Sequence, residues 1–345
     1  MFAWREGPQG QLCYTRTVAT ELRPFSIGPI SIDPPVVLAG LAGYSDLAYR
    51  MVCRRLGAPY CTTEMMLDKS LLAGRKLRNR LAAISDEDHP VAAQLIGNDP
   101  VVMSEAASLV YGLGFDVVDL NFACPVKKAL RRGRGGHFMA HPREALEITR
   151  AVLSAVDIPV TLKLRRSFAQ VDGDEDCLRI AEGAFQAGAA AITVHARSVE
   201  AKYMGPADWG FLARVKREFP NQTVIGSGDM LTPSAAIRAI EQTGADAVAV
   251  ARGALGNPWF FRQVTDVLAG REPYRPSLAE QRELLAGHFD HACRLYGSVR
   301  GPKIMRKFGI KYARLHHRPR DVRMAFAAVK RPRDWHETVE KMYVV

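Results

Sequence analysis

One cysteine, Cys124, stands between a buried strand-like run and a cluster of cations. The stretch DVVDLNFACPVKKALRRGRGG covers residues 116–136, and its apolar run ends at Asn121. A lone buried cysteine is more often a small core residue than a reactive one. A thiol with an ordinary pKa near 8.5 can, however, act as a general acid close to neutrality. The position of Cys124 favours this chemical role. The cations that follow it, with no acid among them, are Lys127, Lys128, Arg131, Arg132 and Arg134.

Polar or glycine-containing stretches end most of the other strand-like runs. A single glutamine or histidine at such a place is usually a satisfied hydrogen-bonding residue, but a lysine is rarely buried without a partner. Seven such ends among eight runs favour one shared site. In chain order they are Glu64, Gln94, Asn121, Lys163, His195, Ser227 to Asp229, and Ala251 to Gly253.

The last two of these ends are rich in glycine. GSGDM begins at Gly226 and ARGALGNP at Ala251. Glycine lets backbone N–H groups approach an anion, and Arg252 adds a charged donor, so the two loops predict a phosphate site rather than a pair of simple tight turns. Lys163 is placed where it could stabilise negative charge on a reduced ring, and the Gln94 amide can both donate and accept hydrogen bonds. The set therefore fits a flat phosphorylated cofactor such as a flavin.

The elements that position these residues alternate along the chain. Eight short β-branched runs are separated by stretches with helical spacing, a pattern typical of parallel strands covered by helices. Eight such units predict a (β/α)8 TIM barrel. An open doubly wound sheet is the alternative, but no G-x-G-x-x-G follows the first run. The runs occupy residues 36–40, 60–64, 91–95, 116–121, 159–164, 190–195, 223–228 and 246–251.

Three segments are expected. Residues 1–35 form an N-terminal extension with a hairpin around Gly28 that closes the barrel floor, residues 36–270 form the barrel, and residues 277–345 form a basic helical domain. This last segment holds fifteen lysines and arginines against seven acidic residues, so it carries most of the net charge of +11. The excess indicates a polyanionic partner, although a charged helical face can also serve solubility alone.

Composition excludes several other classes. The six cysteines form no C-x-x-C pair, which argues against a cysteine zinc site or a disulfide scaffold, and we expect no metal. The first ten residues have no apolar signal region, and no run is long enough to cross a membrane. We therefore expect a cytoplasmic protein that acts as a monomer.

Taken together, the motifs resemble the tRNA-dihydrouridine synthases, in particular their bacterial nitrogen-regulation-like branch. The similarity runs from about residue 24 to the end of the chain. It rests on the order and spacing of GYSDLAYR, AAQLIGNDP, DLNFACPVKK, VTLKLRRS, VHARSVEAKYMGPADW, VARGALGNPWFF and LYGSVRGPKIMRKFGIKYA.

The resemblance implies that FMN binds over the barrel mouth, that NADPH reduces it, and that a uracil of tRNA receives hydride at C6 and a proton from Cys124 at C5. It implies that Asn121, Arg165 and Arg197 contact the substrate. The RNA backbone would lie on the loop from Lys127 to Arg134 and on Lys303, Arg306 and Lys307. The implied cofactor contacts are Ala39, Gly40, Leu41, Gln94, Lys163, His195, Ser227, Gly228, Asp229, Ala251, Arg252 and Gly253.

Gly40 and Ser227 depart from the family pattern, and His137 lies in a stretch that differs from it. We interpret His137 as a loop histidine rather than a second acid. Two other functions compete. An FMN barrel acting on a free pyrimidine or enoate would share the cofactor site but would not need the basic segment. An RNA-binding protein with an inactive barrel would not need the cofactor residues.

Overall fold

The computed structural model describes residues 5–6, 12–13, 22–169 and 174–344. Its main sheet is a closed barrel of parallel strands, in which the first strand pairs with both its sequence neighbour and the last strand. This confirms the predicted (β/α)8 fold and excludes the open sheet. The strands are β5 (Val36–Leu38), β6 (Cys61–Thr62), β7 (Met66–Leu67), β8 (Val91–Ile96), β9 (Val117–Asn121), β10 (Val160–Arg165), β11 (Ala191–His195), β12 (Val224–Ser227) and β13 (Ala247–Val250).

The second barrel strand is divided into two pieces. Cys61 in β6 pairs with Val91 at the start of β8, and Met66 in β7 pairs with Leu95 near its end. The residues between the two pieces leave the ladder. Glu64, which the sequence placed at a strand end facing the shared site, lies in this gap.

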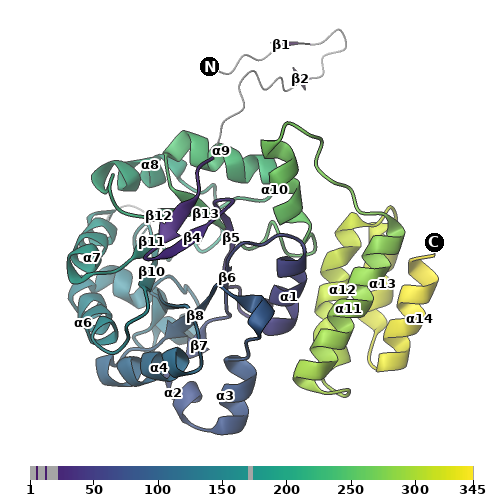
Figure 1. The fold of residues 1–345 in the computed structure, drawn as a ribbon, viewed down its shortest axis with the longest axis horizontal. Helices are drawn as coiled ribbons and strands as arrows, with labels where there is room; N and C mark the ends of the chain where they lie inside the picture. Colours follow the sequence, from purple (N-terminus) through teal and green to yellow (C-terminus); the bar gives the residue numbers. More distant parts are fainter. Residues whose placement is uncertain (1–4, 7–11, 14–21, 170–173, 345) are drawn as a thin grey trace.

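Helices surround the barrel (Figure 1). Several begin and end where the sequence indicated: Asp46, Asp99 and Thr232 each accept a hydrogen bond from the first turn of their helix, and Gly244 ends one with φ of +71°. The barrel helices are α1 (Leu47–Arg55), α2 (Asp68–Leu72), α3 (Arg75–Leu81), α4 (Pro100–Gly112), α5 (Lys127–Leu130), α6 (Pro142–Leu153), α7 (Asp174–Ala187), α8 (Trp209–Glu218), α9 (Pro233–Thr243) and α10 (Phe260–Leu268), with 3-10 turns η1 (Asp86–Asp88) and η2 (Gly135–Ala140).

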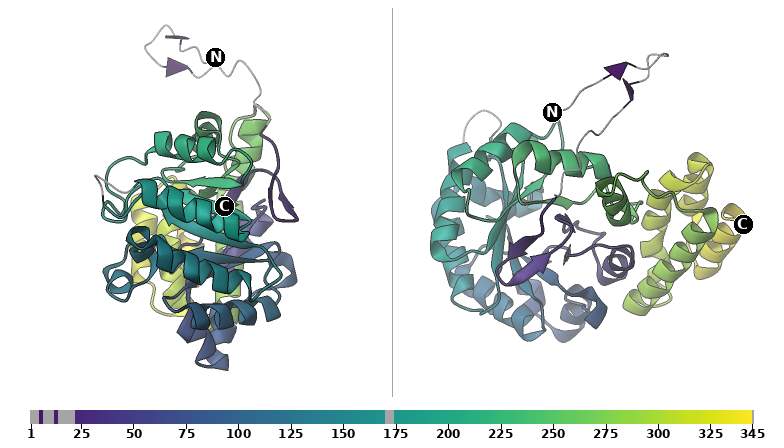
Figure 2. Two further views of the ribbon diagram at one scale, coloured as in Figure 1. Left: turned by 90° about the vertical axis from the view of Figure 1, so that its left-hand side faces the viewer. Right: turned by 45° about the horizontal axis from the view of Figure 1, so that its top comes forward.

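A hairpin lies across the amino-terminal end of the barrel (Figure 2, right). Its strands β3 (Phe25–Ile27) and β4 (Ile30–Ile32) pair antiparallel, and Phe25 and Ile27 are buried with the inward-facing side chains of the barrel strands. Burying these apolar side chains removes the barrel interior from water at this end. The site is thus left open only at the carboxyl ends of the strands. A short antiparallel pair, β1 (Arg5–Glu6) and β2 (Leu12–Cys13), precedes the hairpin.

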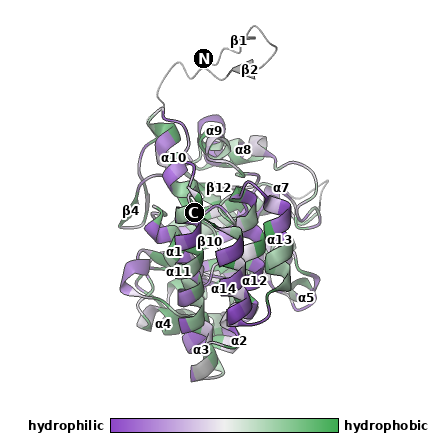
Figure 3. Cartoon of the chain, turned by 90° about the vertical axis from the view of Figure 1, so that its right-hand side faces the viewer, coloured by the Kyte–Doolittle hydropathy of each residue, from purple (hydrophilic) through white to green (hydrophobic). Residues whose placement is uncertain are grey.

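Four helices pack beside the barrel, and hydrophilic residues cover much of their outer surface (Figure 3). They share one hydrophobic core with the barrel helices, in which the ring of Tyr49 of α1 packs against that of Phe308 with their centres 5.3 Å apart. Among the described residues, no helix is both long and apolar enough to cross a membrane. The four are α11 (Leu278–Tyr296), α12 (Gly301–Tyr312), α13 (Pro319–Ala328) and α14 (Pro332–Met342), with the 3-10 turn η3 (Ala313–Leu315). We call them the helical bundle.

Candidate active site

A pocket with a volume of about 500 Å³ lies at the carboxyl ends of the barrel strands. Strand ends that are far apart in sequence meet here because all strands are parallel. Most of the residues predicted from the sequence line it: Ala39, Gly40, Leu41, Gln94, Asn121, Cys124, Lys127, Lys163, Arg165, His195, Ser227, Gly228, Asp229, Ala251 and Arg252.

Three polar side chains form a buried chain on one wall. The amide nitrogen of Gln94 donates to Asp119 at 2.7 Å, and the Gln94 carbonyl accepts from the Asn121 amide at 2.7 Å. Burial raises the pKa of Asp119, while its hydrogen bonds from Gln94 and Thr161 act in the opposite direction. Because both ends of the Gln94 amide are engaged, the orientation of that side chain is fixed.

Asn121 also shapes the loop that carries Cys124. Its side-chain carbonyl accepts from the backbone N–H groups of Ala123 at 3.1 Å and Cys124 at 2.9 Å. Such a side-chain turn holds the chain in a fixed bend as it leaves β9. The sequence resemblance assigned Asn121 to the uracil. In the structure its oxygen positions the Cys124 loop and its amide nitrogen holds Gln94.

The Cys124 side chain faces the pocket and is only 7% exposed. Burial raises the pKa of its thiol, although a hydrogen bond from the Val126 backbone and the charge of Arg165 act against this rise. The thiol is therefore protonated at neutral pH. Gly135 has φ of +60°, and a Cβ there would lie 2.7 Å from the Cys124 Cβ. Only glycine allows η2 to pass so close to this side chain.

Two nitrogen atoms on the next two strands, β10 and β11, are buried without a hydrogen-bond partner in the described part of the chain: Lys163 Nζ and His195 Nδ1. Burial lowers the pKa of Lys163 to about 8. Burial and the charges of Arg165 and Lys163 lower the pKa of His195 to about 2, so this imidazole is neutral. Buried polar atoms are rarely left unpaired, so these two indicate a ligand site.

A group of charged residues closes the pocket at β12 and β13. The carboxylate of Asp229 accepts from Arg197 at 2.6 Å, from Arg252 at 3.1 Å and from the Ala207 backbone at 2.8 Å. Burial acts to raise the pKa of Asp229, but these partners outweigh it and hold the pKa below its ordinary value. Gly228 has φ of +123°, which other residues rarely adopt. The corner combines Arg252, which is 40% exposed at its side chain, with a glycine backbone.

Two arginines that the sequence assigned to the substrate are engaged within the protein. Arg165 donates to the backbone carbonyls of Ala123, Ser198 and Lys202 at 2.8–2.9 Å. Arg197 lies outside the pocket lining and pairs with Asp229, so it orients that carboxylate. The cause in both cases is burial, since guanidinium groups that leave water must find acceptors inside the protein. Gly253 also lies outside the lining and packs against Met230.

A sequence model of the dihydrouridine synthase family matches residues 37–344 of this chain. The chain belongs to the dihydrouridine synthase family. It is 35% identical to tRNA-dihydrouridine synthase B of Xanthomonas axonopodis pv. citri, over 89% of this chain and 92% of that protein. It is 37% identical to tRNA-dihydrouridine synthase B of Pseudomonas aeruginosa, over 81% of this chain and 84% of that protein. The resemblance seen in the motifs is confirmed, and the chain is an oxidoreductase by family.

Solved structures share the barrel at low sequence identity. A 2-naphthoyl-CoA reductase matches with a TM-score of 0.56 and 13% identity, over 72% of this chain and 52% of that chain. Histamine dehydrogenase from Rhizobium sp. 4-9 matches with a TM-score of 0.56 and 15% identity, over 78% of this chain and 50% of that one. At these identities the likeness shows only that this chain shares the fold with them.

Several lining residues of this family member were not expected from the sequence, among them Met65, Tyr203 and Met230. Tyr203 is 54% exposed, and the guanidinium groups of Arg252 and Arg165 lie 5.0 and 5.9 Å from its ring centre. It lies within the family motif VHARSVEAKYMGPADW, but in a loop rather than at a strand end. Only the motif could have identified it.

The loop cations expected to hold the RNA backbone lie beside the pocket. Lys127 lines it, Lys128, Arg131 and Arg132 are exposed, and Arg134 is half-buried with its Nε 3.5 Å from the Asn98 carbonyl. Four of the five are therefore near the mouth with their charged ends available to an anion.

The three cations predicted on the bundle do not share one environment. Lys303 and Arg306 are exposed, whereas the Lys307 ammonium donates to the Gly43 carbonyl. Burial lowers the pKa of Lys307, while the charges of Asp46 and Glu64 raise it. The cavity that contains Glu64 and Lys307 lies at the junction of barrel and bundle, apart from the main pocket. Lys307 thus joins the two parts, and Glu64 does not face the active site.

Proposed function

We propose that this protein reduces the C5=C6 bond of a uridine in tRNA, with FMN as its cofactor, NADPH as reductant and Cys124 as proton donor. The observation that carries the proposal is the placement of one protonated thiol and two unpartnered buried nitrogens, Lys163 Nζ and His195 Nδ1, around one pocket. The substrate class follows from relatives whose names are those of tRNA-dihydrouridine synthases.

The lining residues fit a flavin. Lys163 and His195 offer hydrogen-bond donors to oxygen and nitrogen atoms of the ring system. The hydrogen bond from Gln94 to Asp119 fixes the orientation of the Gln94 amide toward the same site. Arg252 and the backbone at Gly228 would hold the phosphate, since both present N–H groups to an anion. When bound, FMN supplies the hydride that the C6 position of the uracil accepts, and NADPH supplies the electrons that renew it.

Cys124 completes the reduction. Addition of hydride at C6 leaves negative charge conjugated to the C4 carbonyl, and C5 must then take a proton. The Sγ–H of Cys124 gives this proton and becomes a thiolate, which solvent reprotonates. The raised thiol pKa keeps the proton in place until it is needed.

The uridine must leave its stack in the tRNA to reach the pocket, at a cost of a few kcal/mol. Backbone contacts offset this cost because each neutralised phosphate releases counterions. The exposed cations next to the mouth, from Lys127 to Arg132, are the first candidates, and Lys303 and Arg306 of the bundle are the second.

The test is turnover by Cys124→Ala, with Cys293→Ala as a matched control because Cys293 lies outside the pocket. Wild type and both variants should purify with FMN, accept electrons from NADPH and bind tRNA. Dihydrouridine formation, measured by mass spectrometry of the tRNA, should fall by ~10²–10⁴ only in Cys124→Ala.

Three results would contradict the proposal. A protein that cannot be reconstituted with FMN would remove the cofactor, and equal turnover in the two cysteine variants would remove Cys124 as the acid. Reduction of free uridine or an enoate in preference to tRNA would favour the small-molecule oxidoreductase instead.

A further inference from the structure

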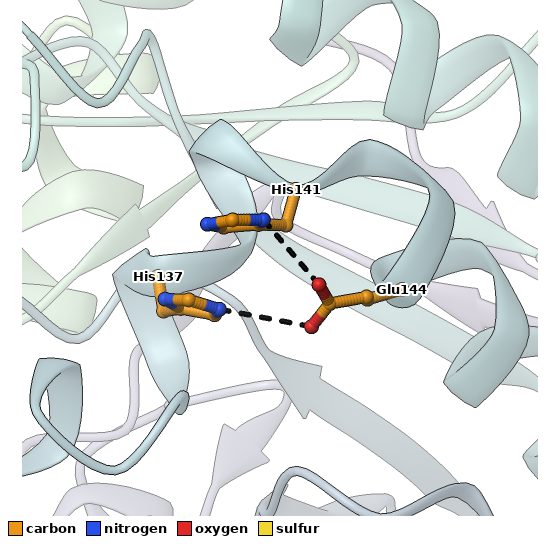
Figure 4. Close-up of side chains that lie close together, drawn as sticks. All are labelled: His137, His141 and Glu144. Atoms are coloured by element: carbon orange, nitrogen blue, oxygen red, sulfur yellow. Dashed lines mark ion pairs between the residues drawn. The ribbon is translucent and has the colours of Figure 1, made fainter.

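A second cluster of chemically active side chains lies outside the pocket. His137 belongs to η2, His141 follows it, and Glu144 lies in the first turn of α6. The Nε2 atom of His137 is 3.7 Å from one carboxylate oxygen of Glu144, and Nδ1 of His141 is 3.3 Å from the other (Figure 4). All three ligand atoms lie within 4.8 Å of one another.

Local structure explains the convergence. The 3-10 turn η2 runs directly into α6, because His141 is both its last flanking residue and the residue before Pro142, which opens the helix. The spacings of four and three residues place the three side chains on one side of this turn. The two imidazole rings stack at 4.0 Å with an interplanar angle of 17°, and both present a nitrogen to Glu144.

We propose that His137, His141 and Glu144 bind one divalent transition-metal ion of the zinc type. Two imidazoles and a carboxylate form a ligand set that zinc accepts, at about 2.0–2.2 Å from each ligand atom. In tetrahedral coordination such bond lengths put neighbouring ligand atoms about 3.3–3.6 Å apart. The nitrogen-to-oxygen separations of 3.3 and 3.7 Å run to the two different oxygens of Glu144, and the three ligand atoms together lie within 4.8 Å. The two stacked imidazoles must therefore turn so that both nitrogens point at the ion, which their partly exposed side chains allow.

The position of the cluster suggests what the ion does. None of the three side chains lines the pocket, so the ion would not touch the cofactor or the reacting base. The η2 segment is instead joined to the catalytic loop, since Gly136 N–H donates to the Cys124 carbonyl at 2.9 Å. An ion that ties His137 to α6 would hold η2, and through it the loop of Cys124, in one place. The three side chains are 26–56% exposed, which leaves a coordination position for water.

Zinc binding tests the proposal directly. The full-length protein is freed of metal with a chelator and titrated with Zn²⁺ against a chromophoric competitor. Wild type should bind one equivalent, and His141→Ala and Glu144→Gln should each weaken that binding by at least about tenfold. His89→Ala is the matched control, because His89 also contacts a carboxylate, Asp116, at 2.8 Å but belongs to no such three-residue cluster within the described part of the chain.

Cobalt distinguishes this site from a thiol site. The Co²⁺ form should show visible ligand-field bands without the near-ultraviolet charge-transfer band of a thiolate ligand, since nitrogen and oxygen are the donors. Circular dichroism should show that His137→Gln and the other variants are folded. The absence of Zn²⁺ binding in wild type, unchanged affinity in folded variants, or a thiolate band with Co²⁺ would each overturn the proposal.

Discussion

Some pocket residues destabilise the folded protein when no ligand is bound, because their polar groups are buried without a partner in the described part of the chain. Lys163 is the clearest case, because its ammonium is buried without a hydrogen-bond partner among the described residues. Its pKa falls from 10.5 to about 8 for this reason. Between these two values the unfolded chain holds a proton that the folded chain has lost. The stability of the ligand-free protein should therefore rise with pH across this window.

Replacement of Lys163 with methionine should make the flavin-free protein more stable at pH 7, by ~1–3 kcal/mol, because it removes the buried charge. The gain should shrink as pH rises from about 8 toward 10.5, above which the wild-type lysine is neutral in both states. The same change should weaken FMN binding. Urea unfolding at several pH values and a flavin fluorescence titration measure the two effects.

Lys216 provides the control for this prediction. Its ammonium is paired with Asp246 at 2.7 Å and also donates to two backbone carbonyls. Lys216→Met should therefore lose stability at pH 7, a change of opposite sign. A Lys163→Met protein that is less stable than wild type at pH 7 without flavin would contradict the account of this residue.

At the scale of elements, the segment from β9 to η2 sets the position of the thiol. Asn121 bends the chain after β9, and Gly135 and Gly136 bring η2 against Cys124. A Cβ at Gly135 would clash with Cys124 at 2.7 Å, and one at Gly136 would clash with Val199 at 2.7 Å and lie 3.1 Å from the Cys124 carbonyl. The loop between Cys124 and Gly135 holds the cations beside the mouth of the pocket. One compact segment thus carries both the proton donor and the charges offered to an RNA backbone.

Gly135→Ala should lower turnover far more than Gly133→Ala does. Both residues have positive φ, +60° and +64°, so alanine should cost each a similar ~1–2 kcal/mol of backbone strain. Only at position 135 would the added Cβ meet Cys124, at 2.7 Å, and displacement of the thiol by about 1 Å can lower the rate ~10²-fold. Turnover on tRNA and thermal unfolding of both variants provide the comparison. Equal turnover at equal stability would mean that this contact does not position the thiol.

The elements themselves could be predicted well from the sequence. All eight strands appear within about two residues of the predicted runs, because strands buried on both faces leave continuous apolar stretches. The division of the second strand was missed, since the predicted run ended at residue 64 and its second piece, Met66–Leu67, lies beyond it. The side chain of Glu64 consequently faces the junction with the bundle rather than the pocket.

The roles of individual site residues were harder to predict. A polar residue at a strand end looks the same in sequence whether it meets a ligand or a backbone carbonyl. Arg165, Arg197 and Asn121 turned out to use most of their hydrogen bonds within the protein. Lys307 shows the same limit on a helix, where spacing defines a face but not the element that packs against it. The cluster around His137 was missed because its three members were not considered together.

In the whole molecule, the excess positive charge of the last segment is concentrated on the helical bundle. The basic segment folds into the bundle, whose exposed cations include Lys303 and Arg306, while Lys307 is held at the junction by Gly43. Each cation that contacts a phosphate contributes to the salt dependence of RNA binding. A contribution to that dependence is therefore expected from the first two residues and not from the third.

Arg306→Ala should lower the slope of log affinity for tRNA against log salt concentration by ~0.7–0.9, the loss of one phosphate contact. Arg217→Ala is the matched control, because Arg217 is equally exposed but lies on α8, on the far side of the barrel from the bundle (Figure 1). Filter-binding or fluorescence titrations over a salt series measure both slopes. Identical slopes for the two variants would show that the RNA docks away from this face of α12.

The aromatic contacts between barrel and bundle hold the two parts at one fixed separation. Tyr49 of α1 packs on Phe308 and His288, and Tyr296 of α11 donates to Asp46 at 2.8 Å, so no free hinge separates the pocket from the bundle. If the function proposed above holds, a tRNA whose phosphates are bound to the bundle can place near Cys124 only a nucleoside that lies at one fixed distance from those phosphates. The enzyme would then select a uridine by its distance from the bound phosphates. The same base with the same neighbours, moved to another position along the RNA, would not reach Cys124.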